Sequence, residues 1–318
     1  MQEPKITKPV IIIGCPRSGT SLLFRILSTS NELWSLYRES NDIWNSYYKL
    51  TGKDFKDETL EASDLDEKSR IFLLNEFHKH TINNYPIGYM IREYFLKKKP
   101  LNPLLNIITS VNLTYKNIFL NDYRIVEKTP KNCFRIPFID KLFKNCTYIF
   151  LKRDGRANIN SLIEGWKLPG KYVRGQAQDI KLNIKNYSEN NGNYWKWKYV
   201  LPPGWENYTD KSLEEVCAFQ WIASNKAAIQ GLKNIEESRK YTISYEELSE
   251  NTYETIEKVC KFINVPFSDE LKKISQNPPL VNYVTKPKKD KWKKNIQMIE
   301  KTYSDIEPMM KELGYSLQ

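Results

Sequence analysis

Four short apolar runs along the chain have the length and composition of strands buried in a parallel sheet. These runs are residues 10–13, 123–127, 147–152 and 240–244. Helical patterns separate them, and the clearest follows the first run, where apolar residues recur at helical spacing until poor helix formers at 28–31 end the helix. Further helices are predicted over 212–235 and 253–263. This alternation predicts an α/β fold with a central parallel sheet.

One long segment between the first two runs predicts a helical insertion. Residues 54–68 are acidic and are expected to form an exposed loop or the start of a helix. Residues 69–120 carry long amphipathic patterns, such as Ile71, Leu74 and Phe77. The insertion is therefore placed at about 54–120.

A second unusual segment, at about 190–208, is rich in aromatic residues. It combines an Asn-Asn-Gly-Asn sequence and a Pro-Pro-Gly turn with Tyr194, Trp195, Trp197 and Trp205. We expect an aromatic loop over one face of the sheet, whose rings either stack against an acceptor or pack in a core. No repeat and no linker divides the chain, so residues 1–318 are predicted to form a single domain with helical insertions.

The composition narrows the class of protein without naming it. With 318 residues, 40% of them hydrophobic, the chain can bury a sizeable core, which excludes disordered, collagen-like and disulfide-knot proteins. A formal net charge of +11 favours an anionic partner of unspecified kind. The five cysteines are scattered with no CxxC pair, so we expect no zinc site, no disulfide framework and a reducing compartment. No stretch has the length of a membrane span or the form of a signal peptide, and a cytoplasmic protein is predicted.

The first strand leads into a turn that has the features of a phosphate-binding loop. Its sequence is Gly14-Cys15-Pro16-Arg17-Ser18-Gly19-Thr20-Ser21, and a helix follows at once. The glycines allow the backbone to turn around an anion, and the helix N-terminus adds positive potential where the hydroxyl groups donate. The alternative is an ordinary glycine-containing turn between a strand and a helix.

The turn departs from the Walker pattern of nucleoside triphosphatases at one position. Its two glycines have the Walker spacing, but Thr20 stands where the Walker lysine belongs, and Arg17 is the only cation of the turn. A kinase or NTPase uses that lysine with magnesium to neutralise a triphosphate. The turn is therefore better suited to a less charged group, and we expect no metal ion.

A second candidate anion site follows the third strand. The strand ends in Arg153-Asp154-Gly155-Arg156, and Ser161 lies two helical turns further on. Open α/β sheets bind ligands at the carboxyl ends of their strands, so Arg153 and Ser161 are placed to hold a second phosphate. By itself an Arg-Asp pair at a strand end is as often a structural ion pair.

Taken together, PRSGTS at 16–21 and RDGRANINS at 153–161 resemble the sulfotransferase family. The resemblance extends to EKTPKN at 127–132 and SYEEL at 244–248, and one departure is Gly155, where many members have proline. It implies a P-loop-like three-layer fold and 3′-phosphoadenosine 5′-phosphosulfate (PAPS) as sulfuryl donor, with 3′-phosphoadenosine 5′-phosphate (PAP) as product.

The resemblance assigns donor-binding roles to the two anion sites. Residues of the first turn are expected to bind the 5′-phosphosulfate: Arg17, Ser18, Gly19, Thr20 and Ser21. Arg153 and Ser161 are expected to bind the 3′-phosphate that distinguishes PAPS from ATP, a task that suits the planar donors of a guanidinium.

The transfer also needs a base and cations near the leaving phosphate. The resemblance implies that Glu39 is the base, with a solvated or paired glutamate as the alternative, and partial burial is expected to raise its pKa toward neutrality. It also implies that Lys128, with Arg17, is a cation of the site, with a surface pair of Glu127 and Lys128 as the alternative, and Lys131 is a weaker candidate. His78 and His80 lie outside the family motifs and are interpreted as surface or core residues.

The most basic stretch of the chain lies near its C-terminus. The basic segment 286–294 is either a solvated face or a cover of the nucleotide site through Lys289, Lys291 or Trp292. The predicted function is sulfuryl transfer from PAPS to an acceptor hydroxyl, on a carbohydrate or another small molecule, and no nucleic-acid partner is expected. The alternatives are a divergent P-loop kinase or NTPase, and a polyanion-binding protein without activity.

Overall fold

A computed structural model gives the fold of the chain. It describes residue 4 and residues 6–36, 39–82, 115–116, 122–173, 180–188, 196–281 and 290–317. Within these residues, six strands form a single sheet in the order β3-β2-β4-β1-β5-β6. The strands are β1 (Val10–Ile13), β2 (Leu33–Leu36), β3 (Thr81–Ile82), β4 (Arg124–Lys128), β5 (Thr147–Lys152) and β6 (Lys240–Ser244).

The five main strands run parallel, and the short edge strand β3 pairs antiparallel with β2. Three of the four predicted strands have the predicted bounds. The remaining one, β4, begins and ends one residue later than predicted, because Tyr123 makes only an isolated bridge with Ile6. The predicted α/β fold with a central parallel sheet is confirmed. The parallel strand β2 and the antiparallel edge strand β3 were not among the four predicted strands.

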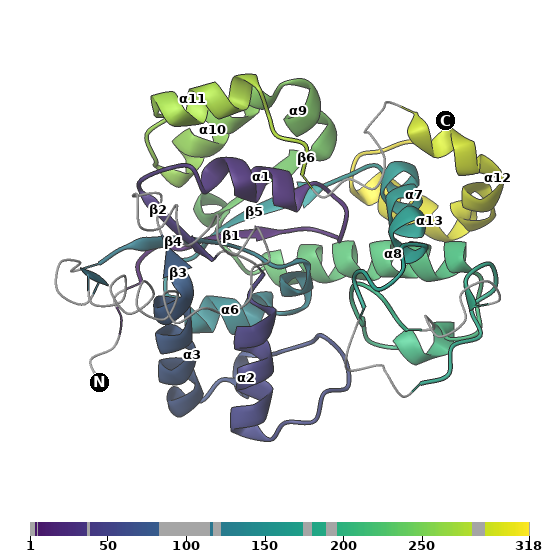
Figure 1. Ribbon diagram of the computed structural model, residues 1–318, viewed down its shortest axis with the longest axis horizontal. Helices are drawn as coiled ribbons and strands as arrows, with labels where there is room; N and C mark the ends of the chain where they lie inside the picture. Colours follow the sequence, from purple (N-terminus) through teal and green to yellow (C-terminus); the bar gives the residue numbers. More distant parts are fainter. Residues whose placement is uncertain are drawn as a thin grey trace.

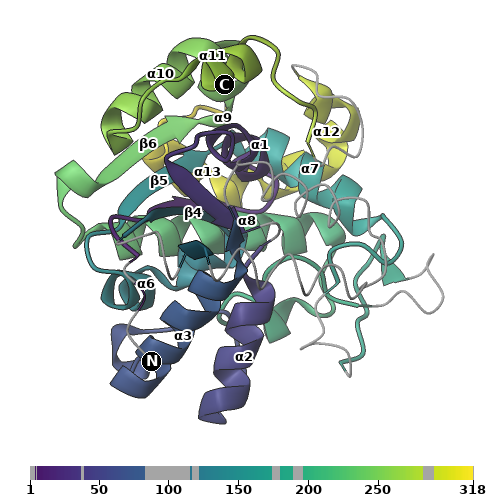
Figure 2. The ribbon, with the colours of Figure 1, turned by 60° about the vertical axis from the view of Figure 1, so that its left-hand side comes forward.

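Helices cover both faces of the sheet, as Figures 1 and 2 show. One face carries α1 (Thr20–Leu27), α9 (Tyr245–Glu250), α10 (Thr252–Ile263) and α11 (Asp269–Gln276). The other carries α2 (Asn41–Thr51), α3 (Glu67–His80), α6 (Ile136–Leu142), α7 (Gly155–Trp166), α8 (Leu213–Leu232), α12 (Ile296–Ile299) and α13 (Tyr303–Glu312). The result is a three-layer architecture.

The two cores follow from the alternation of side chains along the strands. In β1, Val10 and Ile12 belong to the core beneath α1, while Ile11 and Ile13 belong to the core on the opposite face. Every residue of β1 is buried, which explains why the strand is a continuous apolar run. β1 lies between β4 and β5, and all three strands run parallel. The turn after β1 therefore lies between the carboxyl ends of β4 and β5.

Local capping signals set several helix ends. Ser212 accepts a hydrogen bond from the Glu215 backbone N–H, and the Glu215 carboxylate accepts one from the Ser212 N–H, so α8 begins at Leu213 rather than 212. At the C-terminal end of α10, Asn264 adopts a left-handed conformation, and the helix ends at Ile263 as predicted. The predicted end of α8 at 235 was wrong, because the helix ends at Leu232, where the Lys233 N–H bonds to the Gln230 carbonyl three residues back. The sequence therefore carries some of these helix boundaries locally.

The acidic segment 54–68 is not uniformly exposed. Glu58 is fully buried, and its carboxylate accepts a 2.6 Å bond from the Arg135 guanidinium. The expectation of an exposed loop was wrong at this position because a distant arginine pairs with the carboxylate. The greater part of the predicted insertion, residues 83–114 and 117–120, lies outside the described residues.

The aromatic segment contributes to a core. Tyr194 and Trp195 lie outside the described residues, whereas Trp197 and Trp205 are buried and pack edge to face with ring centroids 5.2 Å apart. Trp197 also packs against Trp166 of α7. Neither of these two indole rings is available to stack on a ligand.

Candidate active site

The turn between β1 and α1 has the backbone that an anion-binding loop requires. Arg17 and Gly19 have φ angles of 73° and 97°, both in the left-handed region. A Cβ atom on Gly19 would lie 2.4 Å from the Tyr245 ring, so only glycine fits here. The Ser18 hydroxyl is buried and has no hydrogen-bond partner within the described part of the chain. An unpaired buried hydroxyl beside a helix N-terminus suits an anionic ligand.

Arg17 extends from the turn to the middle of the neighbouring helix α7. Its Nε donates to the Ser161 hydroxyl at 3.2 Å, and its NH1 donates to the Tyr172 hydroxyl at 3.4 Å. Tyr172 in turn stacks on Tyr199 with ring centroids 4.7 Å apart. Residues from three segments that are distant in sequence therefore fix the direction of this guanidinium.

The Arg153 side chain points toward the turn after β1. The two candidate anion sites are therefore close to each other, as binding of one ligand by both would require. It follows β5, which lies next to β1 in the sheet, and its NH1 donates to the Arg17 carbonyl at 2.6 Å. Its guanidinium lies over the Tyr245 ring at 4.1 Å. Burial lowers the pKa of Arg153, and its buried Nε has no hydrogen-bond partner among the residues described. This free donor can bind an anion.

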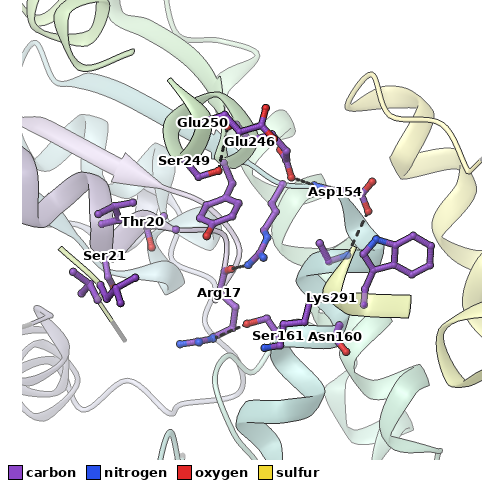
Figure 3. Close-up of a pocket in the computed structure, with 18 of the residues that line it drawn as sticks. Arg17, Thr20, Ser21, Asp154, Asn160, Ser161, Glu246, Ser249, Glu250 and Lys291 are labelled. Atoms are coloured by element: carbon purple, nitrogen blue, oxygen red, sulfur yellow. Dashed lines mark hydrogen bonds between the residues drawn. The ribbon is translucent and has the colours of Figure 1, made fainter. Parts of the chain in front are cut away.

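Both candidate anion-binding segments line one cavity of about 620 Å³ (Figure 3). Figure 3 shows Arg17 reaching toward Ser161, with Thr20 and Ser21 on one side and Asn160 and Lys291 on the other. The rest of the wall comes from α9, the start of α10 and the segment 278–281. Ser18 is absent from the cavity lining, whereas the other predicted donor-binding residues all belong to it.

The C-terminal region closes one side of this cavity. Lys291 and Trp292 line it, and Lys291 Nζ forms a 2.5 Å ion pair with Glu164 of α7. The Trp292 ring lies against the Arg156 guanidinium at 4.8 Å, and that guanidinium also pairs with Asp154. The Lys291–Glu164 pair, together with the Arg156–Trp292 contact, ties the cover to α7. Lys289 lies outside the described residues.

Glu39 and Lys128 meet at the same edge of the sheet, on the side of β2 and β4. Lys128 is the last residue of β4 and stands in register with Ile12 of β1, one residue before that strand ends. Its Nζ donates to Glu39 Oε1 at 2.6 Å, and the Glu39 side chain remains 37% exposed. Neither residue lines the 620 Å³ cavity. The pair lies beside the turn that follows β1, at the carboxyl ends of adjacent strands.

The expected rise in the pKa of Glu39 was wrong. Burial acts to raise this pKa, but the charge and the hydrogen bond of Lys128, with smaller contributions from Lys131 and Asn41, outweigh it. The pKa of Glu39 therefore lies below its ordinary value, and the carboxylate is ionised at neutral pH. Lys131 is buried, with its Nζ 4.0 Å from Glu58.

The two histidines serve local structure. His78 is buried, and its Nδ1 lies 2.8 Å from the Tyr123 hydroxyl, while His80 Nδ1 lies 2.8 Å from the Glu76 carbonyl at the preceding helical turn. Neither lines the cavity. These contacts agree with their interpretation as structural residues.

Two contributions to the site were missed at the level of sequence. From the sequence, Tyr245 of the SYEEL motif was assigned no role in the site, yet its ring packs on Gly19 and beneath the Arg153 guanidinium and lines the cavity. Tyr172, which contacts Arg17, carries no motif around it that signals a role. In both cases the role depends on a contact between distant segments, which no local pattern records.

The described residues contain neither a candidate metal site nor a membrane span. No group of three or more His, Cys, Asp or Glu residues is placed to hold a metal ion within the parts of the chain described. Likewise, no helix among these residues is both long and apolar enough to cross a bilayer. All five cysteines are buried and unpaired.

Comparison with protein families identifies the class of protein. The sequence matches the model of the sulfotransferase family over residues 9–204, which is more than half of the chain. The chain therefore belongs to the sulfotransferase family. The matched region includes both anion-binding segments, Glu39 and Lys128, and it favours the sulfotransferase interpretation over the kinase and polyanion-binding alternatives. No curated protein sequence matches the chain.

Comparison with solved structures supports the same fold through one sulfotransferase domain, and two further matches are weaker. The sulfotransferase domain from the curacin biosynthetic pathway is 18% identical, with a TM-score of 0.51, and the match covers 99% of this chain and 100% of that domain. Sulfotransferase STF9 from Mycobacterium avium is 12% identical, with a TM-score of 0.49 and coverage of 98% and 78%. Retinol dehydratase in complex with androsterone and PAP is 13% identical, with a TM-score of 0.38 and coverage of 99% and 84%.

Proposed function

We propose that this member of the sulfotransferase family transfers a sulfuryl group from PAPS to an acceptor hydroxyl by direct in-line displacement. The observation that carries the proposal is the contact between the two anion-binding segments. Because Arg153 donates to the Arg17 carbonyl at 2.6 Å and both residues line one cavity, one doubly phosphorylated nucleoside can reach both.

The residues present fit such a nucleotide. The segment from Arg17 to Ser21 would hold the 5′-phosphosulfate through backbone N–H groups, hydroxyls and the Arg17 guanidinium. Arg153 and Ser161 would hold the 3′-phosphate. An unpaired buried donor that belongs to a cavity-lining residue supports this assignment, the Arg153 Nε, because it lacks the partner that a phosphate oxygen would supply.

The groups around the reacting centre would divide the chemistry between them. Bound PAPS supplies a sulfuryl group whose bond to the 5′-phosphate breaks as the acceptor oxygen forms a new bond to sulfur. Glu39, as the ionised base, receives the acceptor proton. Lys128 and Arg17 stabilise the negative charge that develops on the departing phosphate.

The ion pair between Glu39 and Lys128 has a consequence for this mechanism. Lys128 holds the pKa of Glu39 low, so Glu39 is a weak base while the pair is closed. When Lys128 turns toward negative charge on the donor, Glu39 loses its strongest charged partner and becomes a stronger base. Donor binding would therefore activate the base.

The acceptor is proposed to carry its hydroxyl on a carbohydrate or another small molecule. Burial of Trp197 and Trp205 removes these two rings as candidates for stacking on it. Supplying cell extracts with PAPS and the protein, and searching by mass spectrometry for products that gain a sulfate, would identify it. A cytoplasmic location is also proposed, since the five cysteines are all buried thiols of the kind found in reducing compartments.

Isothermal titration calorimetry tests the donor site directly. PAP is expected to bind in the presence of a chelator as tightly as with magnesium, and to bind more tightly than 5′-AMP, which lacks the 3′-phosphate. Each charge-assisted bond to that phosphate contributes about 1.5–3 kcal/mol, so the affinity ratio should be at least about tenfold. Equal affinities for PAP and AMP would contradict the role of Arg153 and Ser161.

A further inference from the structure

A buried carboxylate stands directly behind the Glu39–Lys128 pair and has no role in the proposed chemistry. Glu127 is the penultimate residue of β4, and its side chain lies at the interface between that strand and the loop that carries Glu39. The residue is only 2% exposed. Burial is the dominant influence on its pKa and raises it, which reflects the unfavourable environment of this charge.

Three neutral side chains donate hydrogen bonds to Glu127. The Ser40 and Thr129 hydroxyls both donate to Oε1 at 2.6 Å. The Asn132 side-chain amide donates to Oε2. In addition, the Ser40 backbone N–H donates to the Thr129 hydroxyl at 3.0 Å, which closes the cluster. All four residues are buried, so water does not compete for these bonds.

This cluster joins the two segments that carry the proposed base and its partner. Ser40 directly follows Glu39, and Lys128 directly follows Glu127. The bond from Ser40 to Glu127 therefore runs beside the 2.6 Å bond from Lys128 to Glu39, and two adjacent pairs of residues connect the loop to the strand. Ser40 also stands immediately before α2, so the start of that helix is held at the same point.

We propose that Glu127 is a positioning residue that holds Glu39 against Lys128 by anchoring Ser40 and Thr129 at the end of β4. The proposal rests on the proposed function, in which Glu39 is the base. A shift of about 1 Å in a reacting group is sufficient to lower a catalytic rate by orders of magnitude. Glu127 would act on the rate through Glu39, without touching either substrate.

The hydrogen-bond pattern also identifies a conservative replacement. In Glu127→Gln, the amide oxygen can accept from both hydroxyls as Oε1 does. The new amide nitrogen would face Asn132, whose Oδ1 is buried and has no hydrogen-bond partner among the described residues. If the Asn132 amide turns over, its Oδ1 accepts that bond. Glutamine therefore preserves the cluster without the charge, whereas Glu127→Ala removes all three acceptor contacts.

The test compares Glu127→Ala, Glu127→Gln and the control Glu214→Ala. Glu214 is another buried carboxylate, in the first turn of α8, and it lies outside the cavity and the cluster. Hydrogen exchange of the peptide that spans residues 39–44 reports the anchoring. Release of inorganic sulfate from PAPS, with water as the acceptor, reports the rate at saturating PAPS. Calorimetry with PAP reports the donor site.

We expect Glu127→Ala to accelerate hydrogen exchange in residues 39–44 and to lower the rate of sulfate release about ten- to a hundredfold. The KM for PAPS and the Kd for PAP should stay within about twofold of their wild-type values. Glu127→Gln should restore most of the rate and the slow exchange, and Glu214→Ala should change neither. Unchanged exchange in Glu127→Ala, or an equal acceleration in Glu214→Ala, would overturn the positioning role. Failure of the wild-type protein to bind PAP would instead contradict the proposed function. The hydrogen-exchange comparison would still report whether Glu127 anchors residues 39–44.

Discussion

The 3′-phosphate assignment can be tested most sharply by removing the Arg153 guanidinium. This group has three features that define its role: one donor bonds to the Arg17 carbonyl, the plane lies over the Tyr245 ring at 4.1 Å, and the buried Nε has no partner in the described structure. Arg153→Ala removes the free donor together with the positive charge. Arg153→Lys keeps the charge but replaces the planar set of donors by a single ammonium group.

The magnitude follows from the bonds that the phosphate would lose. One charge-assisted hydrogen bond contributes about 1.5–3 kcal/mol, and about 1.4 kcal/mol corresponds to a factor of ten. Arg153→Ala should therefore weaken PAP binding roughly tenfold to a hundredfold for each bond lost. AMP binding should change much less, because AMP has no group at the 3′-position. The ratio of PAP to AMP affinity should fall toward one, with Arg153→Lys intermediate.

Calorimetric titration of the wild type and both variants with PAP and with AMP measures this ratio. Arg25→Ala is the matched control, because Arg25 lies in the last turn of α1 and outside the cavity lining, and its loss removes the same charge. Thermal unfolding of each variant separates a local effect from loss of the fold. If Arg153→Ala weakened PAP and AMP by the same factor, Arg153 would shape the anion loop through the Arg17 carbonyl without recognising the 3′-phosphate.

Four further predictions concern the rate and the pH dependence that follow from Glu39, the loop cation Arg17, and the packing around Tyr199. Glu39→Gln should abolish sulfate release from PAPS while sparing PAP affinity, and a near-normal rate would move the base elsewhere. The pKa of Glu39 is lower in the folded protein than its ordinary value of about 4.3, so its ion pair with Lys128 should stabilise the protein above about pH 4.3. This stabilisation should be lost as the pH falls through the folded pKa. The free energies of unfolding of wild type and Glu39→Gln, measured in urea, should therefore differ at pH 7 and converge in acid. Arg17→Ala should lower both PAP affinity and rate, in contrast to Glu39→Gln, and an effect on rate alone would exclude Arg17 from donor binding. Gly165→Ala should destabilise the fold by about 1–3 kcal/mol in urea unfolding, because the new Cβ would lie 1.6 Å from the Tyr199 hydroxyl, and a neutral result would show that Tyr199 moves freely.

The local sequence determined the elements and the first anion loop. Strands buried on both faces must be apolar throughout, so β1 and the interior of β5 could be located from composition alone. The predicted burial was wrong for β6, because this strand lies at the edge of the sheet and Thr242 is exposed. Glycine at the left-handed position 19, followed by hydroxyl residues and a helical repeat, predicted the turn because each feature meets a backbone requirement within a few residues. Because β1 and β5 are parallel, the segments that follow them, which carry Arg17 and Arg153, lie at the same edge of the sheet.

The tertiary structure alone decided how the side chains of the site act on one another. Lys128 and Glu39 are 89 residues apart, and their 2.6 Å contact is the main reason why the pKa of Glu39 is lowered although burial acts to raise it. Tyr172 reaches Arg17 across 155 residues, and Glu127 reaches Ser40 across 87. Hydrophobic and turn patterns arise from neighbours along the chain, whereas charges and hydrogen bonds depend on distances that form when the sheet is assembled. For this reason the sequence indicated the chemistry of the site, and the fold decided its electrostatics.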